Sequence, residues 1–557
     1  MKRFRKFVAW LFVVPFVCFS LISFKGDERN FLISKYLDIF HSVFRELDMM
    51  YVDTIDVAHA IESGIHAMLS ELDPYTVYYP EEEDEDLKMM ITGKYAGVGA
   101  IIRYHKKHDR VVIVEPYEGM PALDAGLRAG DILLTIDGED LKGLAVDEVS
   151  SRLRGEPGTS LVVRAKREGV ADSIVEVKIQ RANIAMPSVP YYTMLPSNVG
   201  YVILNSFTEE CAREVRMALV DLKNRGARSF ILDLRGNGGG SMAEAIDITG
   251  IFVPKGTTVV STKGKITQSS QSYTTRREPL DIDIPLVVLV DGQSASSSEI
   301  VAGAIQDLDR GIIMGTRTYG KGLVQTVREL PYNASLKVTT SKYYTPSGRC
   351  VQKIDYSKKK STSSVAKDET VEEPTYYTLA GRPVHASGGI TPDVEITSSR
   401  LPNLLFYLAN SEELLDFVTQ YTYHHAEIGP IEEFEVSDSL YFAFKEYVKA
   451  SEFTYDRQSE KALAALKEVA EFEGYAVNAE FIALEEKLKH DIDRDFDIFK
   501  TDICQLLADE LVTRYYYQRG SIIQGLKSDS TVIRACTLLN DAEAYHQVLT
   551  PIKNDKK

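Results

Sequence analysis

A short segment of the chain, from Asp291 to Gln325, contains four closely spaced serines and, further along, one lysine between two glycines. The serines are Ser294, Ser296, Ser297 and Ser298, and the lysine is Lys321. A serine becomes a nucleophile when a base removes its proton, and a lysine can be that base only where burial keeps it neutral. A solvent-exposed lysine, with a pKa of about 10.4, is neutral in only about one molecule in 2,500 at pH 7. These residue types therefore indicate serine–lysine chemistry, but they do not choose among the four hydroxyl groups.

The segments around these residues predict an α/β core with a mostly parallel sheet. The strand-like segments SFILDLRGNGGG and PLVVLVDGQSASSSE each run into a turn rich in glycine or serine, and a helical pattern follows each turn. Alternation of this kind favours parallel pairing, and ligand sites in such sheets lie at the carboxyl ends of the strands. We therefore expect both turns to face one site, where backbone amides at helix starts favour negative charge.

A region of short strands and turns precedes this core, over residues 91–182. Its segments AGVGAIIRY, RVVIVEPY and AGLRAGDILLTIDG resemble a PDZ domain of the bacterial, permuted type. The resemblance implies that a glycine-containing loop binds the carboxylate at the end of a peptide, while the peptide adds a strand to the edge of the domain. This loop comprises Gly97, Val98, Gly99 and Ala100.

Several further segments occur in an order that resembles one family of enzymes. They are DPYTVY, LDLRGNGGG, SASSSEIVAGAIQD, RTYGKGLVQ, YYTPSGRCVQ and GGITPDVEI, within about residues 30 to 400. Together with the PDZ-like region they resemble the carboxyl-terminal processing, or tail-specific, serine proteases. The resemblance implies a core of the crotonase and Clp-protease type, and it selects Ser296 as the nucleophile and Lys321, 25 positions later, as the base.

The resemblance also implies roles for residues near the dyad. Gln325 would help to hold the lysine, and Glu299 and Asp307 would support the site. The oxyanion would be held by the backbone amide of Ser297 and by that of Gly239 or Gly240. This chemistry requires neither a metal nor a cofactor.

Two positions depart from the family pattern. Ser297 replaces the usual alanine after the nucleophile, which leaves the backbone donor intact. Gly238 stands where the family often has proline or another residue, and the added freedom would loosen the loop. We hypothesise that the oxyanion site then forms only when substrate arrives.

Two alternatives compete with the Ser296 and Lys321 dyad. A histidine could be the base, but His105 and His108 lie in a basic turn, His424 and His425 fall outside the core, and His385 fits a surface strand. The chain could instead be a non-catalytic PDZ scaffold that binds peptides on a protease fold. Loss of turnover on removal of the Ser296 hydroxyl would separate the two functions.

The first 25 residues have the pattern of a targeting segment. Lys2, Arg3, Arg5 and Lys6 precede an apolar run from Phe7 to Phe24, which predicts a signal peptide or a membrane anchor. Bulky Phe16 and Val17 disfavour lipid attachment at Cys18. We expect export to a bacterial periplasm, or anchoring in the inner membrane facing it.

The composition and the rest of the chain complete the expected organisation. A net charge of −17 over 557 residues excludes a general nucleic-acid binder. The widely spaced Cys211, Cys350, Cys504 and Cys536 signal neither a disulfide framework nor a metal site.

We expect five regions along the chain. They are a targeting segment at 1–25, a helical segment at 26–90, the PDZ domain at 91–182, the protease core at 183–397 with an exposed loop from Tyr356 to Pro374, and a helical domain at 398–557. The helical domain could pack as an accessory, join two copies of the chain, bind an adaptor protein or restrict the entrance to the active site.

Overall fold

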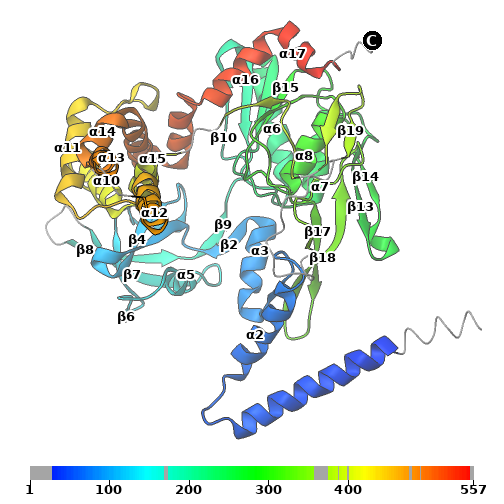
Figure 1. Cartoon of the computed structure of the whole chain (residues 1–557), viewed down its shortest axis with the longest axis horizontal. Coiled ribbons are helices and arrows are strands. Elements are labelled where there is room, and N and C mark those ends of the chain that lie inside the picture. The colour runs from blue at the N-terminus through cyan, green and yellow to red at the C-terminus, as the bar shows by residue number, and fades with distance from the viewer. Residues whose placement is uncertain are drawn as a thin grey trace, which may run out of the picture. The chain divides into compact units, whose positions relative to one another are not determined.

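The computed structural model describes residues 28–167, 173–356, 374–386, 388–397, 401–475, 479–489 and 491–551 (Figure 1). The predicted targeting segment and the body of the loop between Tyr356 and Pro374 lie outside these residues. Within them, no helix is both long enough and apolar enough to cross a membrane. The chain divides into two compact units, Met1–Tyr78 and Tyr79–Lys557.

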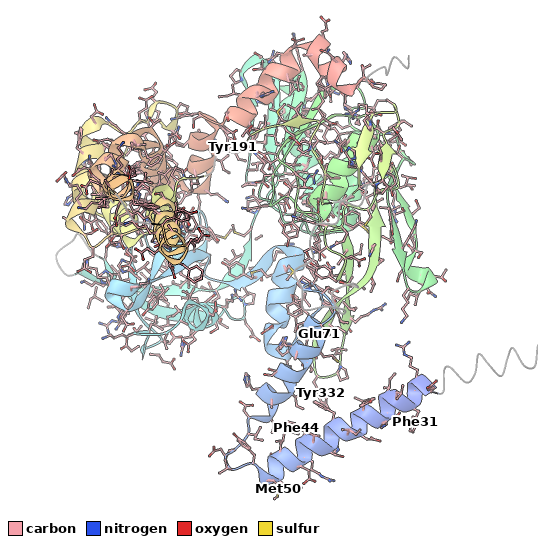
Figure 2. All side chains as sticks on the ribbon, in the orientation of Figure 1. Phe31, Phe44, Met50, Glu71, Tyr191 and Tyr332 are labelled. Carbon is pink, nitrogen blue, oxygen red and sulfur yellow. The ribbon has the colours of Figure 1, made fainter. Side chains whose placement is uncertain are left out.

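The first unit is helical, as the spacing of its apolar residues predicts. Residues 28–50 form one helix, and α2 (Val57–Ser70) begins after Asp56, whose carboxylate accepts a hydrogen bond from the amide of His59 (3.0 Å). A carboxylate at this position stabilises the helix start because the first amides have no partner within the helix. Apolar side chains of the first helix are exposed, among them Phe31 and Met50 (Figure 2).

The core of the second unit is a six-stranded sheet in the order β10-β11-β12-β15-β16-β21. Its strands are β10 (Tyr191–Leu195), β11 (Val199–Ile203), β12 (Ser229–Asp233), β15 (Leu286–Val290), β16 (Ile312–Gly315) and β21 (Val394–Glu395). All neighbouring pairs are parallel except β10 and β11, which confirms the predicted, mostly parallel sheet. The helices between these strands are α6 (Cys211–Asn224), α7 (Met242–Thr249) and α8 (Ser297–Asp307).

Both faces of this sheet are buried, because its strands are apolar at successive positions. Helices α6, α7 and α8 pack on the face that carries Leu232 and Val288. Helices α16 (Ser530–Asn540) and α17 (Ala542–Leu549) pack on the other face, against β15 and β16 (Figure 1). The segment expected as one C-terminal helical domain therefore divides, since its last two helices bury their apolar side chains on the core sheet.

A second, antiparallel set of strands positions Lys321. Strand β18 (Ser335–Tyr344) pairs with β17 (Leu323–Glu329) and with β13 (Thr258–Gly264), and β13 pairs with β14 (Ser272–Thr274). Lys321 lies two residues before β17, and the amide of Tyr343 donates to the carbonyl oxygen of Gly322 (3.0 Å). The lysine backbone is therefore fixed by the same pairing that forms the sheet.

The region expected to be a PDZ domain has its own sheet and its own core. The strands lie in the order β3-β4-β5-β7-β8, and the short β6 (Glu139–Asp140) pairs with β5. They are β3 (Ala100–His105), β4 (Arg110–Pro116), β5 (Ile132–Ile136), β7 (Ser160–Arg167) and β8 (Ser173–Gln180). Helices α4 (Pro121–Asp124) and α5 (Val146–Leu153) contribute to the core beside the sheet, as their sequence patterns predict. The ribbon of β2 (Lys94–Gly97) and β9 (Ala182–Ala185) closes the region.

Seven helices form a separate bundle between residues 403 and 526. They are α9 (Asn403–Ala409), α10 (Glu412–His424), α11 (Asp438–Ala450), α12 (Gln458–Phe472), α13 (Ala479–Leu488), α14 (Ile492–Ile498) and α15 (Lys500–Leu526). Buried Leu408, Phe444 and Leu511 belong to the core of the bundle. Helix α15 breaks at Tyr517, which has a φ of 54° and a ψ of −161°.

Candidate active site

Ser296 occupies a strained turn between β15 and α8. Its φ of 55° and ψ of −111° lie in a region that residues with a side chain rarely adopt. The amide of Ser296 donates to Glu299 Oε2 (2.9 Å), and the side chain of Tyr343 donates to the carbonyl oxygen of Ser296 (3.2 Å). The surrounding structure therefore fixes the backbone that carries this hydroxyl group.

The other three serines of the cluster use their hydroxyl groups to hold the backbone. Ser294 donates to Leu234 O (2.8 Å), Ser297 to Gly240 O (2.9 Å) and Ser298 to Asn237 O (2.8 Å). All three are buried, whereas Ser296 is half-buried, and its hydroxyl donates to no carbonyl group in the described part of the chain. Ser296 is therefore the serine of the cluster that is available for chemistry.

A second turn, which we call the glycine turn (residues 235–240), follows β12 and lies against Ser296. A Cβ atom added at Gly239 would lie 2.8 Å from Ser296 Cβ, and the φ of Gly239 is +100°. Only glycine allows this close approach. The amide of Gly239 donates to Asn237 Oδ1 (2.9 Å), while the amides of Gly240 and Ser297 meet no acceptor among the described residues. Two amides that meet no acceptor among the described residues therefore lie near Ser296.

Lys321 is half-buried on a segment that another part of the chain approaches closely. A Cβ atom at Gly320 would lie 2.8 Å from Lys353 Cβ, and the φ of Gly320 is +90°. The carbonyl oxygen of Gly320 accepts a hydrogen bond from the amide of Lys353 (3.0 Å), and the amide of Gly322 donates to Gln352 Oε1 (2.7 Å). The flanking glycines therefore have a packing role that fixes the lysine backbone.

The Glu299 carboxylate links the serine and lysine segments. Its Oε2 accepts the amides of Ser296 (2.9 Å) and Lys321 (2.8 Å), and its Oε1 accepts the amide of Gly320 (2.8 Å) and the hydroxyl of Thr318 (2.7 Å). Glu299 is fully buried, and this desolvation raises its pKa to about 7 although all four donors favour the ionised form. One side chain thus sets the spacing between the two candidate catalytic segments.

Known families and proteins match most of the chain. Peptidase family S41 matches residues 198–358, the PDZ domain family matches 112–167, and a family described as the probable PDZ-protease C-terminal helical domain matches 404–539. A carboxy-terminal-processing protease of Bartonella bacilliformis is 35% identical over 353 residues, which cover 63% of this chain and 77% of that protein. The chain belongs to peptidase family S41.

Two further proteins are similar to this S41 peptidase. A probable CtpA-like serine protease of Staphylococcus aureus is 32% identical over 370 residues, which cover 66% of this chain and 71% of that protein. Among solved structures, the photosystem II D1 C-terminal processing protease is 28% identical, with a TM-score of 0.35, over 64% of this chain and 87% of that chain. The sequence matches confirm the predicted class: the chain is a serine protease of the carboxy-terminal-processing type that carries a PDZ domain.

Gln325 and Asp307 of the S41 peptidase lie in different surroundings. Gln325 Nε2 donates to Thr339 Oγ1 (3.2 Å) across the pairing of β17 and β18. Asp307 ends α8, about 16.5 Å from Ser296 at 1.5 Å per residue. There its carboxylate is 2.7 Å from Arg349 Nη2 and accepts the amide of Ser347 (2.9 Å). Asp307 therefore anchors the segment that leads to the contacts around Gly320, and it does not touch Ser296.

One group of residues near the site was not singled out from the sequence. Arg235 begins the glycine turn, and its guanidinium lies between the carboxylates of Asp233 (2.5 Å) and Asp529 (2.7 Å). The side chain of Tyr201 donates to Asp233 (2.8 Å). Asp233 and Arg235 belong to the segment LDLRGNGGG, which carries part of the family resemblance, so the sequence contains a signal for both. No sequence signal links Asp529 to this group, because Asp529 lies 294 residues after Arg235.

The predicted PDZ loop (residues 97–100) joins β2 to β3. The carbonyl oxygens of Val98 and Gly99 accept the amides of Ala122 (2.8 Å) and Tyr117 (3.0 Å). Strand β3 is the first strand of its sheet, and among the described strands it pairs only with β4. The loop thus lies beside an edge strand to which an extended peptide can add.

Two of the histidines that were considered as a base for Ser296 have other surroundings. His105 was expected in a basic turn, but it is the last residue of β3, its side chain is 2% exposed, and its Nε2 lies 3.0 Å from Asp416 Oδ1 of α10. His385 is exposed on β20 (Pro383–His385). The described cysteines are free, and the described residues hold no cluster suited to a metal ion.

Proposed function

We propose that this S41 peptidase cleaves with a dyad of Ser296 and Lys321. The neutral lysine amine takes the proton of the Ser296 hydroxyl, which attacks the scissile carbonyl carbon. The scissile C–N bond then breaks as the lysine gives this proton to the leaving amine, which leaves an acyl-enzyme on Ser296. A water that the same lysine activates hydrolyses this acyl-enzyme. The observation that carries the proposal is the Glu299 carboxylate, which bonds to the backbone of both residues, together with the Ser296 hydroxyl, which donates to no carbonyl group among the described residues.

The lysine must be neutral in the working enzyme. A lysine whose pKa falls by about 3 units through burial is neutral in roughly a quarter of molecules at pH 7. Lys321 is half-buried, so a substrate that covers the site would complete its desolvation. In this state Gln325 would help to hold the amine.

The oxyanion would be bound by two backbone amides. That of Ser297 begins α8, where the helix start favours negative charge. The second comes from the glycine turn, and we favour Gly240 because Asn237 already binds the amide of Gly239. The use of Gly239 would require Asn237 to move, as expected if the site forms only when substrate arrives.

The PDZ domain would select substrates by their free C-termini. Gly97, Val98, Gly99 and Ala100 would bind the terminal carboxylate, and the substrate tail would extend β3. An empty PDZ domain would obstruct the active site and a bound tail would open it. The alternative is a non-catalytic scaffold that binds peptides on a protease fold.

The remaining expectations belong to the same proposal. The protease would be exported to a periplasm, with residues 1–25 as a signal peptide or an inner-membrane anchor. The PDZ domain would have the permuted strand order, and the core would be of the crotonase and Clp-protease type. The helical bundle, which covers most of the expected domain at 398–557, would bind an adaptor protein or a second copy of the chain.

The dyad is tested by cleavage of a peptide with an apolar C-terminal residue and a free carboxylate. Ser296→Ala and Lys321→Arg should each lower kcat by at least about 10⁴-fold, since a guanidinium cannot lose its proton. Lys353→Arg is the matched control for the lysine, and it should keep most of the activity. Full turnover by Ser296→Ala would refute the dyad, and absence of turnover by the unaltered protein would favour the scaffold.

A further inference from the structure

The last two helices of the chain bring a carboxylate to the start of the glycine turn. Asp529 precedes α16, and its Oδ1 accepts the amides of Thr531 (2.9 Å) and Val532 (3.0 Å). Its Oδ2 lies 2.7 Å from Arg235 Nη2. One side chain therefore caps a helix with one oxygen atom and holds Arg235 with the other.

Arg235 fixes the backbone where the glycine turn begins. Its amide and its Nε both donate to Asp233 Oδ1 (3.0 Å each), and its Nη2 donates to Asp233 Oδ2 (2.5 Å). Burial alone would lower the pKa of the guanidinium, but the carboxylates of Asp233 and Asp529 raise it. Arg235 is therefore a permanent cation between two carboxylates, a geometry that restricts its side chain more than one partner would.

The rest of the turn depends on such fixed points. Gly236, Gly238, Gly239 and Gly240 have no side chain with which to hold a conformation. The amide of Gly236 donates to Asp291 Oδ1 (3.0 Å), and Asn237 is buried under β11, where its Nδ2 donates to Leu204 O (2.7 Å). If Arg235 moved, the backbone of residues 236–240 would move with it, and the amide of Gly240 would change position.

We infer that Asp529 is a positioning residue for peptide cleavage, acting through Arg235 on the oxyanion amide of the glycine turn. The inference rests on the proposed oxyanion role of that turn. Asp529 is itself held in place, because α16 and α17 pack on the core sheet and the Tyr545 hydroxyl exchanges hydrogen bonds with the amide (3.0 Å) and carbonyl (3.1 Å) of Leu286. The C-terminal helices are thus part of the catalytic framework.

The variant Asp529→Asn in the full chain separates this role from helix capping. Asparagine caps helices as well as aspartate, but it presents an uncharged group to Arg235. We expect kcat to fall by at least about tenfold with KM within about twofold, since the oxyanion contact is made in the transition state. The matched control is Asp541→Asn, because Asp541 caps α17 through the amide of Ala544 (3.0 Å) and contacts no arginine in the described structure.

Folding and the pH profile are measured in the same preparations. Thermal unfolding should give midpoints for the two variants that agree within about 3 °C, and kcat is compared well below both midpoints. The pH dependence of kcat should keep its shape in Asp529→Asn, because the dyad is unchanged. An unchanged kcat in Asp529→Asn, or an equal fall in both variants, would overturn the inference. Failure of the dyad would instead appear as turnover by Ser296→Ala.

Discussion

The glycine turn and the PDZ loop both present backbone amides, but they are held in different ways. Side chains fix the glycine turn: Asn237 binds the amide of Gly239, and Asp291 binds that of Gly236. The PDZ loop is held by backbone hydrogen bonds from Tyr117 and Ala122. An oxyanion forms at one point beside the nucleophile, whereas a peptide carboxylate can adjust together with its chain. Side chains thus hold the amides of the turn that is proposed to bind the oxyanion, and backbone hydrogen bonds alone are described for the PDZ loop.

The largest effect should come from Gly239→Ala in the glycine turn. The new Cβ would lie 2.8 Å from Ser296 Cβ and 2.7 Å from Ala295 O, so the turn or the nucleophile must move. We expect kcat to fall by about 10³-fold with little change in KM, as for loss of an oxyanion donor. Steady-state cleavage of a tail peptide measures both constants.

Gly236→Ala is the matched control for this change. Gly236 lies in the same turn and also has a positive φ (+71°), but a Cβ atom there would meet no atom within 4 Å. The kcat of Gly236→Ala should fall by less than about tenfold. An equal loss in the two variants would mean that backbone strain, and not contact with Ser296, governs the turn.

The next effect concerns the pH dependence of stability. Burial raises the pKa of Glu299 from 4.5 to about 7, so the folded protein binds this proton more tightly than the unfolded chain does. The free energy of unfolding should therefore decrease by about 3 kcal/mol through this group as the pH rises from about 4.5 to above 7. Urea unfolding at about pH 5, 6, 7 and 8 measures it.

Glu299→Gln should lack this component of the pH dependence. The glutamine amide cannot ionise, so the difference in stability between the two proteins should change steadily between about pH 5 and pH 7. Parallel curves would show that Glu299 keeps the same charge throughout this range. Among the described residues, no side-chain carboxylate bonds to the amides of the PDZ loop in the way that Glu299 bonds to those of Ser296 and Lys321.

The smallest effect should come from the PDZ loop. A Cβ atom at Gly99 would lie 2.7 Å from Met120 Cβ, and the φ of Gly99 is +77°. Gly99→Ala should raise KM about tenfold for a peptide with a free carboxylate, with kcat nearly unchanged. For the C-terminally amidated peptide, KM should already be high and the substitution should add little.

The control for Gly99 lies in the neighbouring turn. Gly119 also has a positive φ (+68°), and a Cβ atom there would meet open space. Gly119→Ala should leave both peptides unaffected. If Gly99→Ala lowers kcat, the PDZ loop also affects catalysis, and its role is not confined to binding the peptide.

Local patterns in the sequence predicted much of the fold and of the candidate site. Apolar runs followed by glycine or serine identified β12, β15 and the start of α8, because these signals lie within a few residues. The same signals could not place Asp307, since the length of α8 decides how far that carboxylate lies from Ser296. The choice of Ser296 among four serines needed the family resemblance, and its strained backbone becomes visible only in three dimensions.

Contacts between distant parts of the chain could not be predicted. His105 lies in a basic stretch that predicted a turn, but it is the last residue of β3, and α10 covers it with Asp416. The apolar spacing of α16 and α17 predicts helices and gives no sign of which surface they cover. Contacts between residues far apart in the sequence depend on the whole fold, so the surroundings of His105 and the packing of α16 and α17 could be learned only from the structure.

The place of Asp529 in the chain also bears on when the protease becomes active during synthesis. A ribosome adds about 5–20 residues per second, so the 208 residues between Lys321 and Asp529 take roughly 10 to 40 s. During that time a growing chain contains Ser296 and Lys321 but not the carboxylate that steadies Arg235. Nascent and prematurely terminated chains would therefore cleave poorly.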